Sequence, residues 1–291
     1  MADAVAPTRP ADGTQRPSLA RRLLRQPSAV VGGTIVLLVV LAALFAPLLT
    51  PYDVDARNIR ARFAPPTSEH LLGTDNFGRD TLTRILYGAR VSLQVAVLAV
   101  GLAAVIGVLL GSLAGYLGGL ADQVIMRVVD VFLAFPPILL ALLLVAAVGT
   151  GVGSVTVALG LIYWTAYARV IRAGILALKS EDFVEANRAL GAPWYRTLFG
   201  HVLPNAFSPI IVVASVGLGA AVTAEAALSF LGLGIQPPVP SWGSILNVGL
   251  QFLRQTPYLS TFPGLAIMVT VLGFNLLGDG LRDVLDPRRA T

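Results

Sequence analysis

Six long apolar stretches limit what this chain can fold into more than any other feature. A helix needs about 20 apolar residues to cross the hydrocarbon core of a bilayer. Stretches close to this length lie at residues 30–49, 91–116, 131–148, 152–171, 210–232 and 262–277. Because backbone polar groups must be satisfied inside the membrane, the sequence predicts an all-α integral membrane protein with six transmembrane helices.

The composition fits a membrane protein and excludes several other classes. Hydrophobic residues make up 55% and charged residues 13% of the 291-residue chain, and the mean hydropathy is +0.76. Soluble domains carry about 25% charged residues, so neither a disordered chain nor an ordinary soluble enzyme fits. The absence of cysteine excludes disulfides, thiolate metal sites and cysteine nucleophiles. The net charge of +5 comes from basic residues at the ends of apolar stretches, which indicates membrane topology and not nucleic-acid binding.

The chain divides into an N-terminal tail at residues 1–29 and a transmembrane domain at residues 30–291. The first apolar stretch is too long for a signal-peptide core and lacks a small-x-small cleavage site, so we expect it to remain as an anchor. If the N-terminus is inside, 14 basic residues fall in inner segments and 7 in outer ones. This bias predicts that both termini are cytoplasmic and that residues 50–90 form a large outer loop.

Glycine and proline predict two details of helix packing. Gly107, Gly111, Gly115 and Gly119 recur every four residues, which favours a groove where a neighbouring backbone approaches closely. The Pro136-Pro137 pair removes two backbone donors from the third stretch and predicts a kink there. Only a few residues separate the third and fourth stretches, so these should form a tight helical hairpin.

Two ionisable residues lie within or beside the predicted spans. A charged side chain in hydrocarbon costs about 2.5–3.5 kcal/mol, so each should face protein or water. Arg169 lies near the inner end of the fourth stretch and is expected to extend to the inner surface. Glu225 lies deeper, and two interpretations stay open: a translocation pathway or subunit contact, or a hydrogen-bonded structural carboxylate. Trp242 and Asn275 are further candidates for lining a pathway.

The inner loop at residues 180–205 is the most informative segment. Ser180 is placed to cap a short helix. Gly191 follows where a helix end favours a positive φ, and Pro193 then starts a second short helix that runs over residues 194–199. The sequence therefore predicts a helix-turn-helix between the fourth and fifth spans.

Apolar side chains on this loop suggest a binding partner. Phe183, Ala186 and Leu190 would share one face of the first helix. Aromatic side chains would be exposed on both short helices, at Phe183, Trp194, Tyr195 and Phe199. Such exposure favours docking to a protein, while a position flat on the membrane is the alternative.

The same loop resembles a known signature. Glu185-Ala186-Asn187-x-x-x-Gly191, followed by Leu203-Pro204, resembles the EAA motif of the permease subunits of ABC importers. Asn187 stands where the general motif has alanine, and His201 where it has an aliphatic residue. Three more segments carry the resemblance, at residues 72–93, 240–243 and 279–288. The chain is thus similar to the "C" permease of dipeptide/oligopeptide/nickel-type ABC importers.

This resemblance implies a fold, coupling residues and partners. The fold would be the type I permease fold of ABC importers, with a cytoplasmic coupling helix-turn-helix between the fourth and fifth spans. The ATPase-coupling residues would be Glu185, Ala186, Gly191, Trp194, Leu203 and Pro204. The partners would be a homologous second permease subunit, two cytoplasmic ABC ATPase subunits that hold ATP and Mg, and an extracytoplasmic solute-binding protein. The complex would lie in a bacterial or archaeal inner (plasma) membrane and import peptides, with nickel chelates and other solutes left open.

The sequence contains no catalytic constellation of its own. Lys179 is the only lysine and follows Leu178, so no Gly-Lys-Ser/Thr P-loop exists and ATP would be bound by partner subunits. We expect no catalytic, cofactor-binding or metal-ligating residues in this chain. The competing hypothesis is a self-contained secondary transporter or channel, for which Glu225 would be the lone deep acid.

The outer loop carries acidic residues that superficially suggest a calcium site. Asp75, Asn76 and Asp80 lack the alternating ligand spacing of a calcium-binding loop. We expect them instead to cap and orient a short helix at residues 81–87 that lies on the outer membrane surface.

Overall fold

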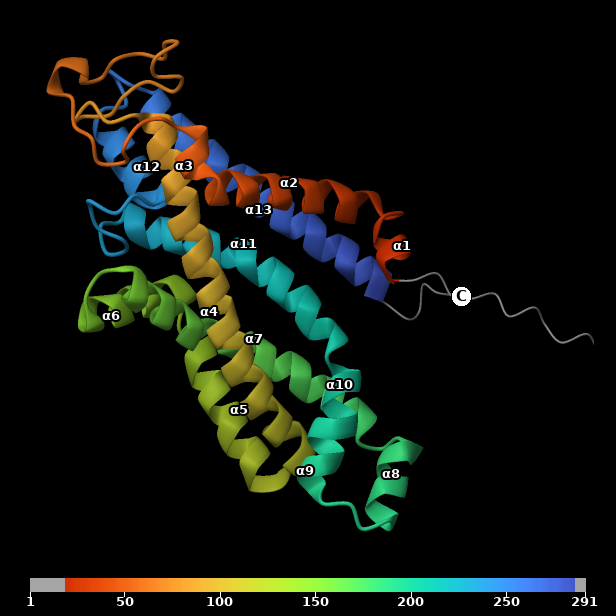
Figure 1. Cartoon of the computed structure of the whole chain (residues 1–291). Helices are drawn as coiled ribbons and strands as arrows, with labels where there is room; N and C mark the ends of the chain where they lie inside the picture. Colours follow the sequence, from red (N-terminus) through yellow and green to blue (C-terminus); the bar gives the residue numbers. More distant parts are fainter. Residues whose placement is uncertain (1–18, 286–291) are drawn as a thin grey trace, which may run out of the picture.

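The computed structural model describes residues 19–285, and helices dominate this part of the chain (Figure 1). The elements in chain order are α1 (Leu19–Leu23), α2 (Pro27–Leu44), α3 (Ala46–Leu49), η1 (Ile59–Ala61), α4 (Thr81–Leu117), α5 (Gly119–Leu133), α6 (Pro137–Val148), α7 (Val152–Leu178), α8 (Asp182–Ala189), α9 (Trp194–Thr197), η2 (Leu198–Val202), α10 (Leu203–Ala206), α11 (Ser208–Phe230), α12 (Trp242–Gln251) and α13 (Tyr258–Leu285). Five of them, α2, α4, α7, α11 and α13, are long and apolar enough to cross a membrane. The bent pair α5 and α6 supplies a sixth span if it is counted as one.

Helices α4 and α7 form the most extensively packed pair in the described part of the chain. Gly107, Gly111 and Gly115 of α4 each face a main-chain carbonyl oxygen of α7, and a Cβ on Gly115 would lie 3.0 Å from the oxygen of Arg172. The predicted glycine groove is therefore confirmed at these three positions. Gly119 is not part of it, because it begins α5 with a φ of 56° and open space where a Cβ would lie.

Helix α13 forms a second packed group with α2 and α11. Gly32 of α2 leaves no room for a Cβ against the α13 backbone at Leu277, and Gly280 of α13 leaves none against Ala29. At the end of this pair, the Gln26 side-chain amide donates a 2.7 Å hydrogen bond to Asp283. The first and last described helices therefore end on the same side of the molecule, as α1 beside the end of α13 shows in Figure 1.

The first half of α4 corrects one prediction. Residues 81–87 do not form a separate helix on the membrane surface but continue into the span as one 37-residue helix. The reason is burial by other elements, since Arg84 and Ile85 are covered and Gly88 packs against the backbone of Ser241. The cap is as predicted for Asp80, whose carboxylate accepts from the Thr83 main-chain N–H at 2.8 Å.

The third span also differs from the prediction of one kinked helix over residues 131–148. The double proline does break it, but α5 begins already at Gly119 and meets α6 at an angle of 91°. Pro136 lacks an N–H and becomes the cap of α6, so the ladder of α5 ends before it. The α6–α7 hairpin is confirmed by its short connection at Gly149–Gly151 and its side-by-side packing.

Helix α5 is tied to α7 by two ion pairs. Arg172 donates two hydrogen bonds to the carboxylate of Asp122, at 2.5 and 2.6 Å. Arg169 contacts Asp130 at 2.8 Å, with both side chains about half exposed. The pair adds a partner for Arg169 that the sequence did not predict, while its extension to the inner surface stays a prediction.

The other boundaries shift by a few residues. The N-terminal tail as predicted falls partly outside the described residues, while α1 and the start of α2 occupy its last part. Helix α2 begins at Pro27 and ends at Leu44, and α13 extends beyond the predicted 262–277 at both ends.

Packing at Gly111 generates a stability prediction. In Gly111→Leu, the side chain must displace the α7 backbone at Ala168, so we expect the unfolding free energy to fall by about 1–3 kcal/mol. Thermal unfolding of the purified protein in mild detergent measures this. Gly101→Leu is the matched control on the same helix, because a Cβ there meets open space and stability should stay unchanged. Equal loss in both variants would contradict the packing account.

Candidate functional site

The loop between α7 and α11, residues 180–205, is termed the coupling segment. It lies at the opposite end of the molecule from α3 and α12 (Figure 1). Gly191 separates α8 from α9 with a φ of 74°, so the predicted glycine turn is confirmed. Two local details differ: the cap of α8 is Glu181 and not Ser180, and the second helix is α9 followed by a π-helical turn at Leu198–Val202.

Three apolar side chains anchor the coupling segment to the transmembrane helices. Val184, Leu198 and Val202 are fully buried and belong to the same core cluster as Ile171 and Ile175 of α7. This anchoring packs the segment against the C-terminal part of α7.

A cation adds a second attachment of the coupling segment. The guanidinium of Arg188 in α8 lies 5.7 Å from the ring centre of Tyr116, near the end of α4. The segment therefore contacts the adjacent ends of both α4 and α7.

The outward side of the segment exposes apolar side chains. The exposed fractions are 37% for Phe183, 85% for Leu190, 46% for Trp194, 54% for Tyr195 and 42% for Phe199. The face of α8 predicted from Phe183, Ala186 and Leu190 is thus exposed, and the buried Val184 lies on another face of the helix. Of the residues expected to couple, Glu185, Ala186, Gly191, Trp194 and Pro204 are exposed, and Leu203 is half-buried.

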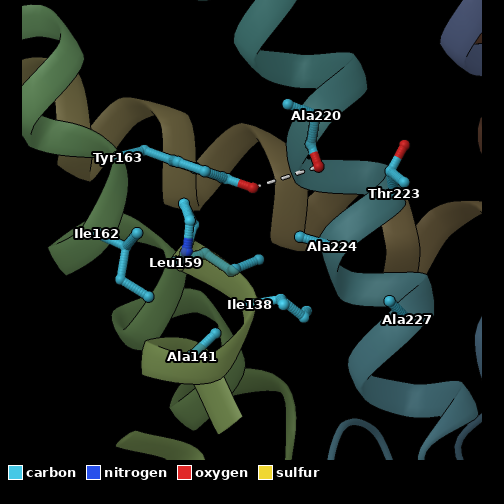
Figure 2. Close-up of a pocket in the computed structure, with 10 residues that line it drawn as sticks. Ile138, Ala141, Leu159, Ile162, Tyr163, Ala220, Thr223, Ala224 and Ala227 are labelled. Carbon is cyan, nitrogen blue, oxygen red and sulfur yellow. Dashed lines mark hydrogen bonds between the residues drawn. The ribbon is translucent and has the colours of Figure 1, made fainter. Parts of the chain in front are cut away.

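A groove runs along the seam between α7 and α11. The part farther from the coupling segment is a hollow of about 490 Å³ lined by α6, α7 and α11, where Tyr163 of α7 donates a 3.4 Å hydrogen bond to the carbonyl oxygen of Ala220 (Figure 2). Two hollows of about 360 Å³ each continue it toward the coupling segment, sharing Val212, Val213 and Arg282 in their walls. We term this continuous feature the α7–α11 groove.

Glu225 lies inside the subunit and not on the groove. Its side chain is fully buried, and its two carboxylate oxygens accept hydrogen bonds from the hydroxyls of Ser92 and Ser229 at 2.7 Å each. Trp242 is 2% exposed and donates from its indole N–H to the carbonyl oxygen of Ile85 at 3.0 Å. These placements give no support to a pathway role for Glu225 or Trp242 and favour the structural carboxylate.

Asn275 is the one of the three pathway candidates with an exposed side chain. It lies on α13 next to α11, with its amide oxygen 3.4 Å from the position of a Cβ on Gly219.

Sequence reasoning missed Tyr163 and Arg282, which line the groove from different helices. A signal was present on α11, where Gly217, Ala220, Ala224 and Ala227 recur at three- and four-residue spacing and leave one face hollow. It did not reveal which residues of α7 and α13 would lie opposite.

Comparison with known families identifies the family of this chain. Residues 107–291 match the model of the binding-protein-dependent transport system inner membrane component. Residues 18–66 match the N-terminal transmembrane domain of oligopeptide transport permease C. The chain belongs to this family of inner-membrane transport components.

Individual relatives cover almost the whole chain of this permease. The dipeptide transport system permease protein DppC of Alkalihalophilus pseudofirmus is 45% identical, over 92% of this chain and 88% of the relative. The glutathione transport system permease protein GsiD of Pectobacterium atrosepticum is 46% identical, over 92% and 89%. A putative peptide transport system permease protein of Brucella suis is also 46% identical, over 92% and 90%. The permease is therefore a multi-span membrane component of a transport complex.

The buried carboxylate gives a second testable prediction. Glu225→Ala leaves two buried hydroxyls without an acceptor, so the unfolding free energy should fall by about 3 kcal/mol. Unfolding in detergent measures it. Thr223→Val, on the same helix, removes only a hydroxyl bonded to its own main chain at Gly219 and should change stability by less than about 0.5 kcal/mol. A Glu225→Ala protein as stable as the parent would refute the structural role.

Proposed function

We propose that this permease forms one half of the translocation pathway of an ATP-driven importer of peptides. Relatives at 45–46% identity are named as permeases for dipeptides, peptides and glutathione, which supports a peptide-type substrate for this chain. The other half would be a homologous permease subunit, and a solute-binding protein outside the membrane would deliver the peptide.

The single observation that carries the ATP-driven mechanism is the exposed apolar surface of the coupling segment. Soluble surfaces rarely expose several aromatic side chains together without a partner. Trp194 and Tyr195 pack edge to face, with ring centres 6.0 Å apart, and present a stable aromatic anchor. We assign this surface to a cytoplasmic ATPase subunit, one for each permease, and ATP with its Mg would be bound there.

The structure suggests how that ATPase would act on the pathway. The coupling segment is anchored to α7 through buried Val184, Leu198 and Val202, and it leads through α10 into α11. A push on it moves the inner ends of α4 and α7, while the outer ends of α4 and α11 stay joined through Ser92 and Glu225. The α7–α11 groove then widens at its inner end and closes again, which switches access to the pathway.

The proposed ATPase contact also implies an orientation in the membrane. If the ATPases are cytoplasmic, the segment, α1 and the end of α13 lie on the cytoplasmic side of a bacterial or archaeal inner membrane. The loop at residues 50–80 and α12 then face the binding protein. A gradient-driven carrier has no comparable support, because Glu225 is fully buried and bonded.

The ATPase assignment is tested by co-purification. The permease is expressed with its neighbouring transport subunits, extracted in mild detergent and weighed by mass spectrometry. The double variant Trp194→Ala/Tyr195→Ala should reduce the amount of co-purified ATPase about tenfold or more, because buried aromatic residues supply much of the binding energy of an interface. Phe45→Ala is the control, since Phe45 is 49% exposed but lies at the far end of α2. Undiminished ATPase recovery with the double variant would reject the docking surface.

The turn at Gly191 gives a test of coupling itself. A Cβ would meet no atom there, so Gly191→Val acts only through backbone strain of about 1–2 kcal/mol at a φ of 74°. We expect ATP-dependent uptake to drop several-fold with unchanged membrane insertion. Gly191→Asn should restore part of the uptake, because asparagine tolerates this conformation.

Gly200→Val serves as the matched control for this experiment. Gly200 also meets open space but has no positive φ, so its uptake should match that of the parent. Normal uptake by Gly191→Val would show that the turn geometry does not transmit force.

A further inference from the structure

A single cation lines the inner end of the α7–α11 groove, among the residues described. Arg282 of α13 lines both hollows at this end. Ser208 of α11 lines one of them, and Tyr163 and Tyr167 of α7 line the other. The other residues that line these two hollows are apolar or small: Ala166, Val170, Pro209, Val212, Val213, Val216, Gly217, Ala220 and Leu285. Arg282 is exposed, so its guanidinium is the one charged group of these two walls that a ligand in the groove can reach.

No carboxylate of the described residues forms an ion pair with Arg282. Asp279 lies one turn earlier on α13 and lines neither hollow. Asp283 accepts the hydrogen bond from Gln26 described above, on the side of α13 that faces α2. Within residues 19–285 no group accepts from the guanidinium, so there its donors are available for a ligand in the groove.

A buried hydroxyl in the same hollow lacks a partner. Tyr167 is 1% exposed, and its hydroxyl forms no hydrogen bond with any described residue. It lies against α11 where a Cβ on Gly217 would be 2.8 Å away. Buried hydroxyls nearly always have a partner, so an unpaired donor in the wall of a hollow points to a ligand that uses it when α7 and α11 separate.

We propose that Arg282 and Tyr167 form an inner subsite that receives the C-terminal carboxylate of a peptide on its way through the permease. This inference rests on the proposed function. A carboxylate is the group that dipeptides, longer peptides and glutathione share, and a guanidinium binds it through two parallel hydrogen bonds. The valines around the subsite accept varied side chains without competing for the charge, which suits a permease that follows the selection made by its binding protein.

The experiment uses the complete importer, with its ATPases and binding protein, in liposomes. Uptake of the radiolabelled dipeptide dialanine is measured for the unaltered complex, Arg282→Gln, Arg282→Lys and Tyr167→Phe. Arg127→Gln is the matched control, because it removes an exposed arginine of α5 that lines a different hollow. ATPase activity stimulated by the loaded binding protein is recorded in parallel, in vesicles of phosphatidylcholine with and without phosphatidylglycerol.

If the subsite exists, the Arg282 and Tyr167 variants should lose maximal uptake rate and no other measured property. Arg282→Gln should lower it about tenfold, Tyr167→Phe about threefold, and Arg282→Lys less than about threefold, in line with charged hydrogen bonds. The half-saturating peptide concentration, the stimulated ATPase activity and the Arg127→Gln complex should stay unchanged.

Three results would overturn the subsite while leaving the proposed function intact. These are full uptake by Arg282→Gln, a parallel loss of stimulated ATPase activity, or a loss confined to vesicles with phosphatidylglycerol. The second would make Arg282 a residue that positions the ATPases, and the third would make it a binder of lipid phosphate. Absence of ATP-dependent dipeptide uptake by the unaltered complex would reject the proposed function, and the subsite with it.

Discussion

The close approach of α4 and α7 is the contact on which the other parts of this permease depend. Gly107, Gly111 and Gly115 bring the α4 backbone against the carbonyl groups of α7, so the two helices behave as one body. One end of this body carries the Asp80 cap, and the opposite end carries the anchored coupling segment. With bulkier residues at the three glycines, neither end would have a fixed position relative to the other.

The two ends of the α4–α7 body meet α11 in different ways. On the side of the Asp80 cap, Glu225 of α11 is joined to Ser92 of α4 in a buried polar cluster, and Leu228 of the same helix belongs to a second apolar cluster with Ile235. Toward the coupling segment, two hollows separate α7 from α11, and no side-chain hydrogen bond among the described residues joins them there except that of Tyr163. The polar cluster resists separation because moving Glu225 away from Ser92 and Ser229 would leave buried polar groups without partners. The outer end therefore suits a pivot, and the inner seam suits the moving part.

The sequence predicted most local features, because these depend on the chain's own backbone chemistry. The glycine spacing on α4, the double-proline break and the positive φ at Gly191 follow from residue type alone. The continuous α4 could not be predicted, because its first turns are buried by tertiary contacts with the preceding loop and with α12, which is about 150 residues away in sequence. Likewise, a missing N–H predicts that a helix breaks, but not the 91° angle that packing against α7 imposes.

The groove was the least predictable part, since its walls come from α6, α7, α11 and α13. Only the small-residue face of α11 is visible as a pattern. The placement of Tyr163, Tyr167 and Arg282 opposite that face depends on the crossing of helices and has no local signature. Glu225 shows the converse case, where a residue type that suggests function turned out to be held in the interior by two hydroxyls.

Distances across the seam test the account most directly. The chain contains no cysteine, so paired cysteines for spin labels can be placed without background. Labels at Ala166 and Val216 report the inner seam, and labels at Val97 and Leu231 report the outer junction of α4 and α11. In the assembled importer, trapping the ATPases in their ATP-bound state should change the inner distance and leave the outer one fixed. An unchanged inner distance, or equal changes at both ends, would contradict a pivot at Glu225 driven through the coupling segment.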